Sequence, residues 1–351
     1  MAALPPAVAA IRTAVRRHLD DLRRRCPGAA SDGGEAPLVL VACSGGPDSL
    51  ALADAVAFVA PRSGWRAGLI TVDHGLQPGS AERADAVARW GLAVGLQPSL
   101  AVPVQVAGRP GGPEAAAREA RYEALAGTAR EHAAVAVLLG HTRDDQAETV
   151  LLALVRGSGP RGIAGMPVYR ELDGVCFVRP LLDISREQTR AACTASGLTA
   201  WEDPHNSDPG FRRTKARAAL RSLVSELGPA VVANLARTAQ LVAADSAALD
   251  QWASAVLAEQ LRAGEGLDCA ALATLPAAVR NRVLHSWARH LGSPGSDLSH
   301  RHVAALAALV TDWHGQGPVH LPAGITVGRV SGRLVQTSPD PLTSVDPPTS
   351  V

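Results

Sequence analysis

Six consecutive residues have the side chains and the setting of a phosphate-binding loop. They are Ser44, Gly45, Gly46, Pro47, Asp48 and Ser49. They follow an apolar run, 38–43, and precede a run of helical character, so we expect them between a strand and the start of a helix. Two glycines let the backbone approach an anion closely, and the N–H groups of a helix start favour negative charge. A simple helix cap would explain the proline and the aspartate but not the two glycines. Because no Gly-Lys-Ser/Thr follows them, the run is not a Walker loop.

A second group of residues that could take part in chemistry, His141, Asp145 and Glu148, follows the apolar run 135–140. Their spacings of four and three residues place all three on one face of a helix. Acids at a helix start complement the helix dipole, but three acids within five residues, with Asp144, also indicate a bound cation. Close to a triphosphate these carboxylates would repel it unless Mg²⁺ bridged them. The other cation that fits is an ammonium or amine ligand.

Basic residues stand out in two places. Arg121 lies in a helical stretch, 117–125, from which it could reach a phosphate oxygen. A run without any acidic residue, 212–221, contains Arg212, Arg213, Lys215 and Arg217. Such a run is typical of a solvated helix. It is equally typical of a patch that binds RNA phosphates beside stacked bases, and the sequence leaves both interpretations open.

The elements that must position these residues follow from the hydrophobic pattern. Short apolar runs at 38–43, 68–73, 100–106 and 135–140 alternate with helical stretches. This alternation predicts βαβ units and therefore an α/β fold with a doubly wound, Rossmann-like parallel sheet. Ligands of such sheets bind beyond the carboxyl ends of the strands. The loop at 44–49 and the pair Asp73 and His74 each follow a strand, so we expect them at the same edge.

The character of the sequence changes after residue 222. A long helical pattern covers 229–263, further helical patterns follow, and residues 319–327 alternate as in a small hairpin. We therefore expect a catalytic domain at 1–222 and a mainly helical domain at 223–338 that ends in the hairpin. The last residues, 339–351, are rich in Pro, Ser and Thr and are expected to be disordered.

Composition narrows the functional classes. The chain has 351 residues, 47% of them hydrophobic and 19% charged, and a net charge of +1, as in an ordinary soluble protein with a sizeable core. No long apolar run predicts a membrane span, and charged residues interrupt the first twenty positions, so we expect no signal peptide. The five cysteines are scattered without a CxxC pair, which argues against a zinc or iron–sulfur site. A cytoplasmic protein is the expected class.

Taken together, these motifs resemble the tRNA(Ile)-lysidine synthases of the PP-loop ATP pyrophosphatase superfamily. The resemblance rests on the loop at 44–49, on Arg118 and Arg121 with Tyr122, and on the block Gly-His-x-x-Asp-Asp-Gln-Ala-Glu-Thr at 140–149. It extends in consistent order over 38–222, and the last third of the chain is only loosely similar. Two positions depart from the family pattern: His205 replaces a more usual serine, and the basic run at 213–217 is a loose version of the family motif.

The resemblance implies a two-step reaction with ATP and Mg²⁺. The C2 oxygen of the wobble cytidine in tRNA(Ile) with a CAU anticodon attacks the α-phosphate of ATP, and free L-lysine then displaces AMP. The loop would hold the leaving pyrophosphate, Asp48 and Asp145 would share Mg²⁺, and Arg121 would stabilise phosphate charge. Glu148, with Asp145 and His141, would position the lysine amine. Asp73 and His74 would lie near the adenosine. The basic run would bind tRNA, and the protein is expected to act as a monomer or homodimer.

Three alternatives remain. A PP-loop tRNA thiolase would use the same adenylation but needs a catalytic cysteine or a cluster, and Cys43 lies in an apolar strand. A small-molecule amidating ligase does not explain the basic segment and the helical C-terminal part. A non-catalytic RNA-binding module would have no use for Asp48, Asp145 and Glu148, because carboxylates that face a phosphate pocket without their cation destabilise the fold.

Overall fold

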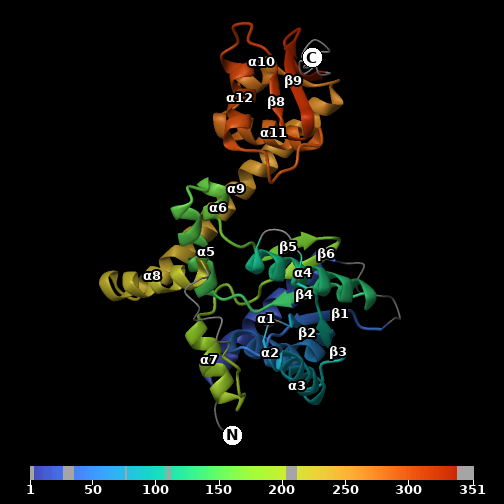
Figure 1. Ribbon diagram of the computed structural model, residues 1–351, viewed down its shortest axis with the longest axis vertical. Coiled ribbons are helices and arrows are strands. Elements are labelled where there is room, and N and C mark those ends of the chain that lie inside the picture. The colour runs from blue at the N-terminus through green and yellow to red at the C-terminus, as the bar shows by residue number, and fades with distance from the viewer. Residues whose placement is uncertain are drawn as a thin grey trace, which may run out of the picture. The chain divides into compact units, whose positions relative to one another are not determined.

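The computed structural model describes residues 4–26, 35–75, 77–106, 108, 112–202 and 212–337. The chain forms two compact units, 1–243 and 244–351, and each is described by itself (Figure 1). The division between the units falls inside a long helix, α9 (Ala230–Arg262), whereas the sequence suggested a boundary after residue 222. The predicted functional domains at 1–222 and 223–338 remain a prediction. The predicted disordered tail, 339–351, lies outside the described residues.

The first unit is built on a six-stranded sheet in the order β3-β2-β1-β4-β6-β5. The strands are β1 (Leu38–Ala42), β2 (Arg66–Asp73), β3 (Ser99–Pro103), β4 (Ala136–Leu139), β5 (Tyr169–Leu172) and β6 (Val175–Val178). All neighbours pair in parallel except β5, which is antiparallel to β6. The predicted α/β fold with a doubly wound parallel sheet is confirmed. The pattern of apolar runs did not indicate β5 and β6, which have only four residues each.

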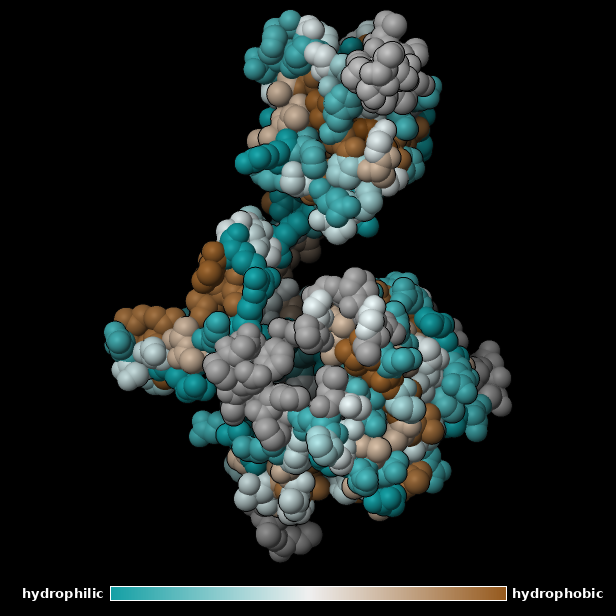
Figure 2. Space-filling model, viewed as in Figure 1, coloured by the Kyte–Doolittle hydropathy of each residue, from teal (hydrophilic) through white to brown (hydrophobic). Residues whose placement is uncertain are grey.

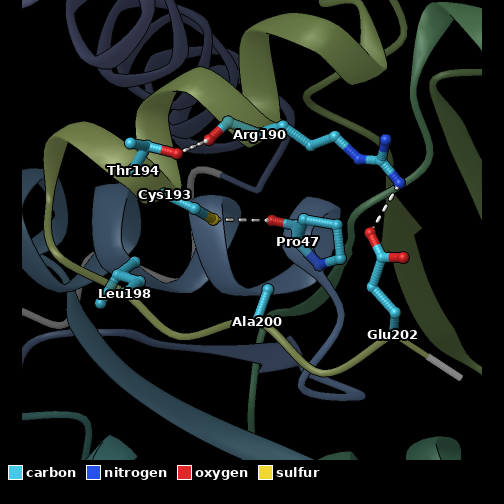
Figure 3. Close-up of a pocket in the computed structure, with 7 residues that line it drawn as sticks. All are labelled: Pro47, Arg190, Cys193, Thr194, Leu198, Ala200 and Glu202. Carbon is cyan, nitrogen blue, oxygen red and sulfur yellow. Dashed lines mark hydrogen bonds and ion pairs between the residues drawn. The ribbon is translucent and has the colours of Figure 1, made fainter.

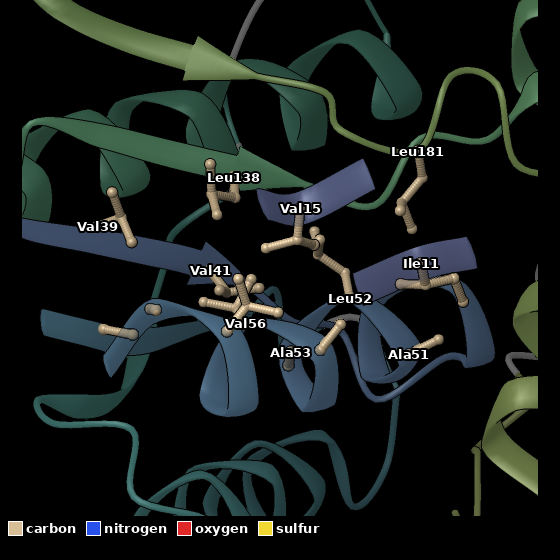
Figure 4. Packing of buried hydrophobic residues seen from close by; sticks show 14 of the residues in the cluster. Ile11, Val15, Val39, Val41, Ala51, Leu52, Ala53, Val56, Leu138 and Leu181 are labelled. Carbon is tan, nitrogen blue, oxygen red and sulfur yellow. The ribbon is translucent and has the colours of Figure 1, made fainter. Parts of the chain in front are cut away.

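Helices pack on both faces of this sheet, with α1 (Pro6–Arg25) and α2 (Pro47–Arg62) on one face and α4 (Pro113–Glu131) on the other. The unit also contains α3 (Ser80–Ala93), α5 (Arg143–Val155), α6 (Gly159–Ile163), α7 (Arg186–Ala195), α8 (Arg212–Leu227) and the first part of α9. Because successive side chains of a strand point to opposite faces of the sheet, β1 contributes residues to the hydrophobic core on each face. Val39 and Val41 pack with α1 and α2 on one face (Figure 4), while Leu38 and Leu40 pack with α4 on the other.

Side chains of Val15 on α1 and Leu52 and Val56 on α2 meet the strands in Figure 4, and all three are fully buried. Burying a Val or Leu side chain contributes about 1.5–3 kcal/mol each. This packing fixes α2, and with it the loop that precedes α2, against the end of β1. In contrast, hydrophobic side chains are exposed over α5 and α8 (Figure 2), where Val155 is 78% and Leu227 is 72% exposed.

The second unit has its own core. It contains α10 (Cys269–Ala273), α11 (Ala277–His290) and α12 (His300–Thr311) beside the second part of α9. A four-stranded antiparallel sheet runs in the order β7-β10-β9-β8, from β7 (Leu267–Asp268), β8 (Val319–Leu321), β9 (Ile325–Val330) and β10 (Arg333–Thr337). Trp287 is the largest buried side chain there. The predicted hairpin is confirmed as β8 and β9 of this sheet. None of the helices in the described ranges is long and apolar enough to cross a membrane.

Candidate active site

The loop predicted to bind phosphate connects β1 to α2, as expected from the sequence. Helix α2 begins at Pro47, Gly46 is its N-cap residue without a side-chain cap, and Gly45 has φ of +80°, which favours glycine. The hydroxyl of Ser49 holds the loop together, since it accepts a hydrogen bond from the Ser44 N–H (3.1 Å) and donates one to the Gly46 carbonyl (2.9 Å). The first N–H groups of α2 are therefore not capped by a side chain and remain available to an anion.

The strand β4 ends beside this loop because Gly140 allows a close approach. A Cβ atom at this position would lie 3.1 Å from the backbone carbonyl of Asp48 and from the Cα atom of Ser49. Any larger residue would push the end of β4 away from the start of α2. Gly140 therefore brings His141 and the start of α5 next to Asp48.

Asp145 caps its own helix with one carboxylate oxygen and binds Arg186 with the other. Its Oδ2 atom accepts a hydrogen bond from the Thr142 N–H (2.8 Å), and its own N–H donates to the Thr142 hydroxyl oxygen (3.4 Å), so the two residues form a capping box at the start of α5. Its Oδ1 atom accepts a hydrogen bond from Nη2 of Arg186 at 2.7 Å. One carboxylate oxygen is thus used by the helix cap, and the other faces the site.

Arg186, the first residue of α7, joins the three predicted acidic residues. Its guanidinium contacts Asp145, donates to Glu148 Oε1 at 3.1 Å and lies 3.7 Å from Oδ2 of Asp48. Its backbone N–H donates to Asp144 at 2.9 Å. The other oxygen of Asp48 accepts a hydrogen bond from the Thr189 hydroxyl. In this structure the three acids face the guanidinium of Arg186, and the bound cation expected from the sequence stays a prediction.

Glu148 is the most buried of the three acids, with 3% of its side chain exposed. Besides Arg186 it binds Arg217 of α8, whose Nε atom lies 2.9 Å from Oε1. Two guanidiniums therefore balance this buried carboxylate. Arg217, expected from the sequence to bind tRNA, is in contact with the acidic cluster, whereas Arg212 and Lys215 on the same helix are exposed.

Charge and burial shift the pKa values in this cluster. Burial, with a contribution from the nearby Asp145 carboxylate, raises the pKa of Asp48 to about 6. Burial would also raise the pKa of Asp145, but Arg186 and the Thr142 hydrogen bonds outweigh it and hold this pKa below its usual value. Burial, together with the positive charges of Arg179 and Arg121, lowers the pKa of His141 to about 3, so its ring is neutral at physiological pH.

The residues expected near the adenosine lie at the same edge of the sheet. Asp73 is the last residue of β2, and its Oδ1 atom accepts a hydrogen bond from the Gly75 N–H at 2.9 Å. Nearby hydrogen-bond donors, including the Ser80 hydroxyl, outweigh burial and lower the pKa of Asp73. His74 follows directly. The N–H of Trp201 donates to the Gly45 carbonyl at 2.9 Å, so the described end of the segment after α7 reaches the phosphate loop.

A cavity of about 290 Å³ opens between α2 and α7 (Figure 3). The Cys193 thiol donates a hydrogen bond to the Pro47 carbonyl at 3.3 Å, and an ion pair between Arg190 and Glu202 (2.9 Å) lies at its rim. Among the residues that line it, Pro47 alone belongs to the phosphate loop, and none is one of the three acids. The cavity therefore lies beside the acidic cluster and does not include it.

Comparison with known proteins shows the family to which the chain belongs. The family model described as a PP-loop domain matches residues 17–224, and the one described as a TilS substrate binding domain matches 267–335. A tRNA(Ile)-lysidine synthase of Salinispora tropica is 61% identical over 340 residues, which cover 97% of this chain and 99% of that protein. The chain belongs to the tRNA(Ile)-lysidine synthase family. The lysidine synthase of Streptomyces coelicolor is 50% identical over a stretch that covers 94% of this chain and 98% of that protein. The lysidine synthase of Mycolicibacterium paratuberculosis is 46% identical over 90% of both chains.

Membership among the lysidine synthases confirms the resemblance seen in the sequence and favours the main functional prediction over a thiolase or a non-catalytic module. ATP use, as the PP-loop match implies, is the confirmed part of the cofactor prediction. The roles of the individual site residues remain predictions. The structure brings Asp48, His141, Asp145 and Glu148 together beside the loop. It adds Arg186, which sequence reasoning missed.

A signal for Arg186 was present in the sequence. Ser185 caps α7 and is followed directly by an arginine, at a helix start where a positive charge is unfavourable. An arginine in such a position needs nearby carboxylates. Only the fold shows which ones, because Asp48 and Asp145 are distant in the sequence.

Proposed function

We propose that this chain adenylates C2 of the wobble cytidine in tRNA(Ile) with a CAU anticodon and then attaches free L-lysine there. In the first step the C2 oxygen attacks the α-phosphate of ATP, the bond between the α- and β-phosphates breaks, and pyrophosphate leaves. In the second step the ε-amine of lysine attacks C2, loses a proton, and AMP leaves with the former C2 oxygen. The observation that carries the proposal is the acidic cluster beside an uncapped phosphate loop in a chain of this family.

The loop at 44–49 binds the phosphates that leave as pyrophosphate. Its backbone N–H groups and the dipole of α2 point to the end of β1, and the Ser49 hydroxyl keeps the loop in shape. Phosphoryl transfer of this kind depends on positioning and on charge stabilisation more than on covalent help. Arg121, half-buried and close to His141, supplies positive charge for the phosphates.

The donor set of the cluster fits Mg²⁺, which prefers one or two carboxylates together with substrate phosphates. Oδ2 of Asp48 has only a long contact of 3.7 Å to Arg186, and Oδ1 of Asp145 also faces the site. These two residues would hold the ion, which would neutralise phosphate charge. No group of three or more His, Cys, Asp or Glu side chains in the described ranges could hold a metal without a substrate.

Glu148 and Asp145 position the lysine amine, and His141 assists as a neutral hydrogen-bonding group. A pKa of about 3 makes the His141 ring a weak base, so a carboxylate is better suited to accept the proton from the ammonium. For the amine to bind, Arg186 must share or release one of these acids. The exposed Arg212 and Lys215, with half-buried Arg213, bind the tRNA backbone.

The test is a reconstituted reaction of the purified full chain with ATP, Mg²⁺, lysine and a tRNA(Ile) transcript with a CAU anticodon. We expect lysine incorporation and pyrophosphate release that depend on the tRNA. Asp48→Asn should abolish both, whereas Asp54→Asn, farther along α2 and hydrogen-bonded only to Ser196 (3.3 Å), should leave them unchanged. AMP formation without lysine incorporation would reject lysine as the nucleophile. Absence of any tRNA-dependent turnover would reject the function.

A further inference from the structure

Four arginines from three parts of the first unit converge on the ring of Tyr122. The guanidinium carbons of Arg118, Arg121 and Arg170 lie 5.0, 5.8 and 5.9 Å from the ring centroid. Arg179 donates to the Tyr122 hydroxyl at 3.5 Å. Arg118 and Arg121 come from α4, Arg170 from β5, and Arg179 directly follows β6. Tyr122 itself is buried against Phe177, so its ring holds the cluster in place.

Like charges dominate the surroundings of this cluster in the part of the chain that the structure describes. Apart from Tyr122, the charged groups that act most strongly on Arg118 are Arg213, Arg179 and Arg170, and no carboxylate is among them. Burial, with these like charges, lowers the pKa of Arg118 below its usual value. Burial likewise lowers the pKa of Arg121, with Arg118 and Arg213 as the cations that contribute most to this shift. An anionic ligand could supply the negative charge that this cluster lacks.

Arg179 gives independent support for an anionic ligand. It is 1% exposed, and its side chain donates to the Tyr122 hydroxyl and, at 2.7 Å, to the Pro167 carbonyl. Both partners are neutral groups, and within the described residues its buried Nε atom has no hydrogen-bond partner. A buried cation without a counterion is costly, so a nearby anion would stabilise it.

The sheet order places this cluster away from the phosphate loop. The loop follows β1, His141 follows β4, and Arg179 follows β6, and these three strands are neighbours in that order. Adjacent strands lie about 4.8 Å apart, so an anion at Arg179 sits roughly 10 Å from the loop, on the far side of His141. An anion at Arg179 is therefore different from the phosphates held by residues 44–49, and of the four arginines only Arg121 is assigned to ATP.

We propose that Arg118, Arg170 and Arg213 bind a backbone phosphate of the RNA strand that carries the target cytidine. This inference rests on the proposed function, because it assumes that the strand enters the site. The guanidinium fork matches a phosphate group, and Arg170 is exposed while Arg118 and Arg213 are half-buried, so the open side of the cluster can accept a polymer. A phosphate held there would fix the position of the cytidine next to His141 and Asp145.

The test measures the affinity of the full chain for tRNA(Ile) as a function of KCl concentration. We expect Arg118→Gln and Arg170→Gln to weaken binding roughly tenfold each and to reduce the slope of log K against log salt by about 0.7. Arg118→Lys keeps the charge and should restore the slope. The matched control is Arg130→Gln, at the other end of α4, where the side chain donates to the Asp173 carbonyl (2.9 Å). ATP affinity should be unchanged in all variants.

Two outcomes would overturn the inference. One is unchanged tRNA affinity and salt slope in Arg118→Gln and Arg170→Gln. The other is weaker ATP binding with unchanged tRNA binding, which would assign the cluster to the nucleotide. The exposed Arg170 keeps the test decisive if Arg118→Gln does not fold. Failure of the wild-type chain to modify tRNA(Ile) would reject the proposed function, whereas an active wild type with unaffected variants rejects only this inference.

Discussion

Arg186 provides the sharpest test of how the site is held together. Its guanidinium contacts Asp48, Asp145 and Glu148, and its own side chain is only 18% exposed. Replacing it with glutamine leaves three partly buried carboxylates with Arg217 as the remaining cation. We expect this substitution to destabilise the first unit strongly, because the acids repel one another and have lost their main counterion.

The expected magnitude follows from burial. Breaking a buried ion pair costs about 3–5 kcal/mol, and the partial exposure of Arg186 favours the lower end, about 3 kcal/mol. For a unit of this size that corresponds to a loss of roughly 6–12 °C in Tm. The matched control is Arg190→Gln, one turn farther along α7. The side chains of Arg190 and its partner Glu202 are 58% and 75% exposed, so we expect a loss of less than about 1 kcal/mol there.

The pH dependence separates this explanation from simple loss of packing. Because Arg186 holds the pKa of Asp145 below its usual value, the stability from this pair is present at neutral pH and is lost as the pH falls through that pKa. The difference in Tm between Arg186→Gln and Arg190→Gln should therefore be present at pH 7.5 and shrink only as the pH falls below the usual aspartate value of 3.8, as measured by thermal unfolding. Equal losses in the two variants at pH 7.5, or a difference that grows in acid, would refute the reasoning.

Three further predictions concern the loop. Gly140→Ala should lower Tm by roughly 2–8 °C, from about 1–2 kcal/mol of crowding against Asp48, and lower kcat, which thermal unfolding and lysine incorporation would measure. Because burial raises the pKa of Asp48 to about 6, its ionised form opposes folding above that pH. Asp48→Asn should therefore raise Tm at pH 7.5, a gain that shrinks toward pH 4, while abolishing turnover. Ser49→Ala removes the hydrogen bonds to Ser44 and Gly46 and should raise KM for ATP, with about 1–2 kcal/mol of lost stability.

The features that could be predicted from the sequence are those formed by residues close together along the chain. The loop at 44–49 was found because its strand, its glycines and its helix follow one another without interruption. Asp145 and Glu148 lie in α5 at the predicted spacing, but the prediction that His141 shares their helix face was wrong, because His141 precedes the N-cap residue Thr142. Arg186 was missed because its relation to Asp48 depends on how α7 packs against α2. The strands β5 and β6 were missed because four residues give too little periodicity to separate a strand from a loop.

The charge balance of the cluster explains how it can be stable before any ligand binds. Asp48, Asp145 and Glu148 together carry three negative charges, and Arg186 and Arg217 supply two positive ones. The two guanidiniums make their shortest contacts, 2.7–3.1 Å, with Asp145 and Glu148, so the unbalanced charge falls on Asp48, which lies 3.7 Å from Arg186. Burial and the nearby Asp145 carboxylate raise the pKa of Asp48, in line with this imbalance. A cation that enters with the phosphates of ATP is therefore attracted first to Asp48, the acid at the start of α2 beside the phosphate loop, and must share Oδ1 of Asp145 with Arg186 to bind both acids.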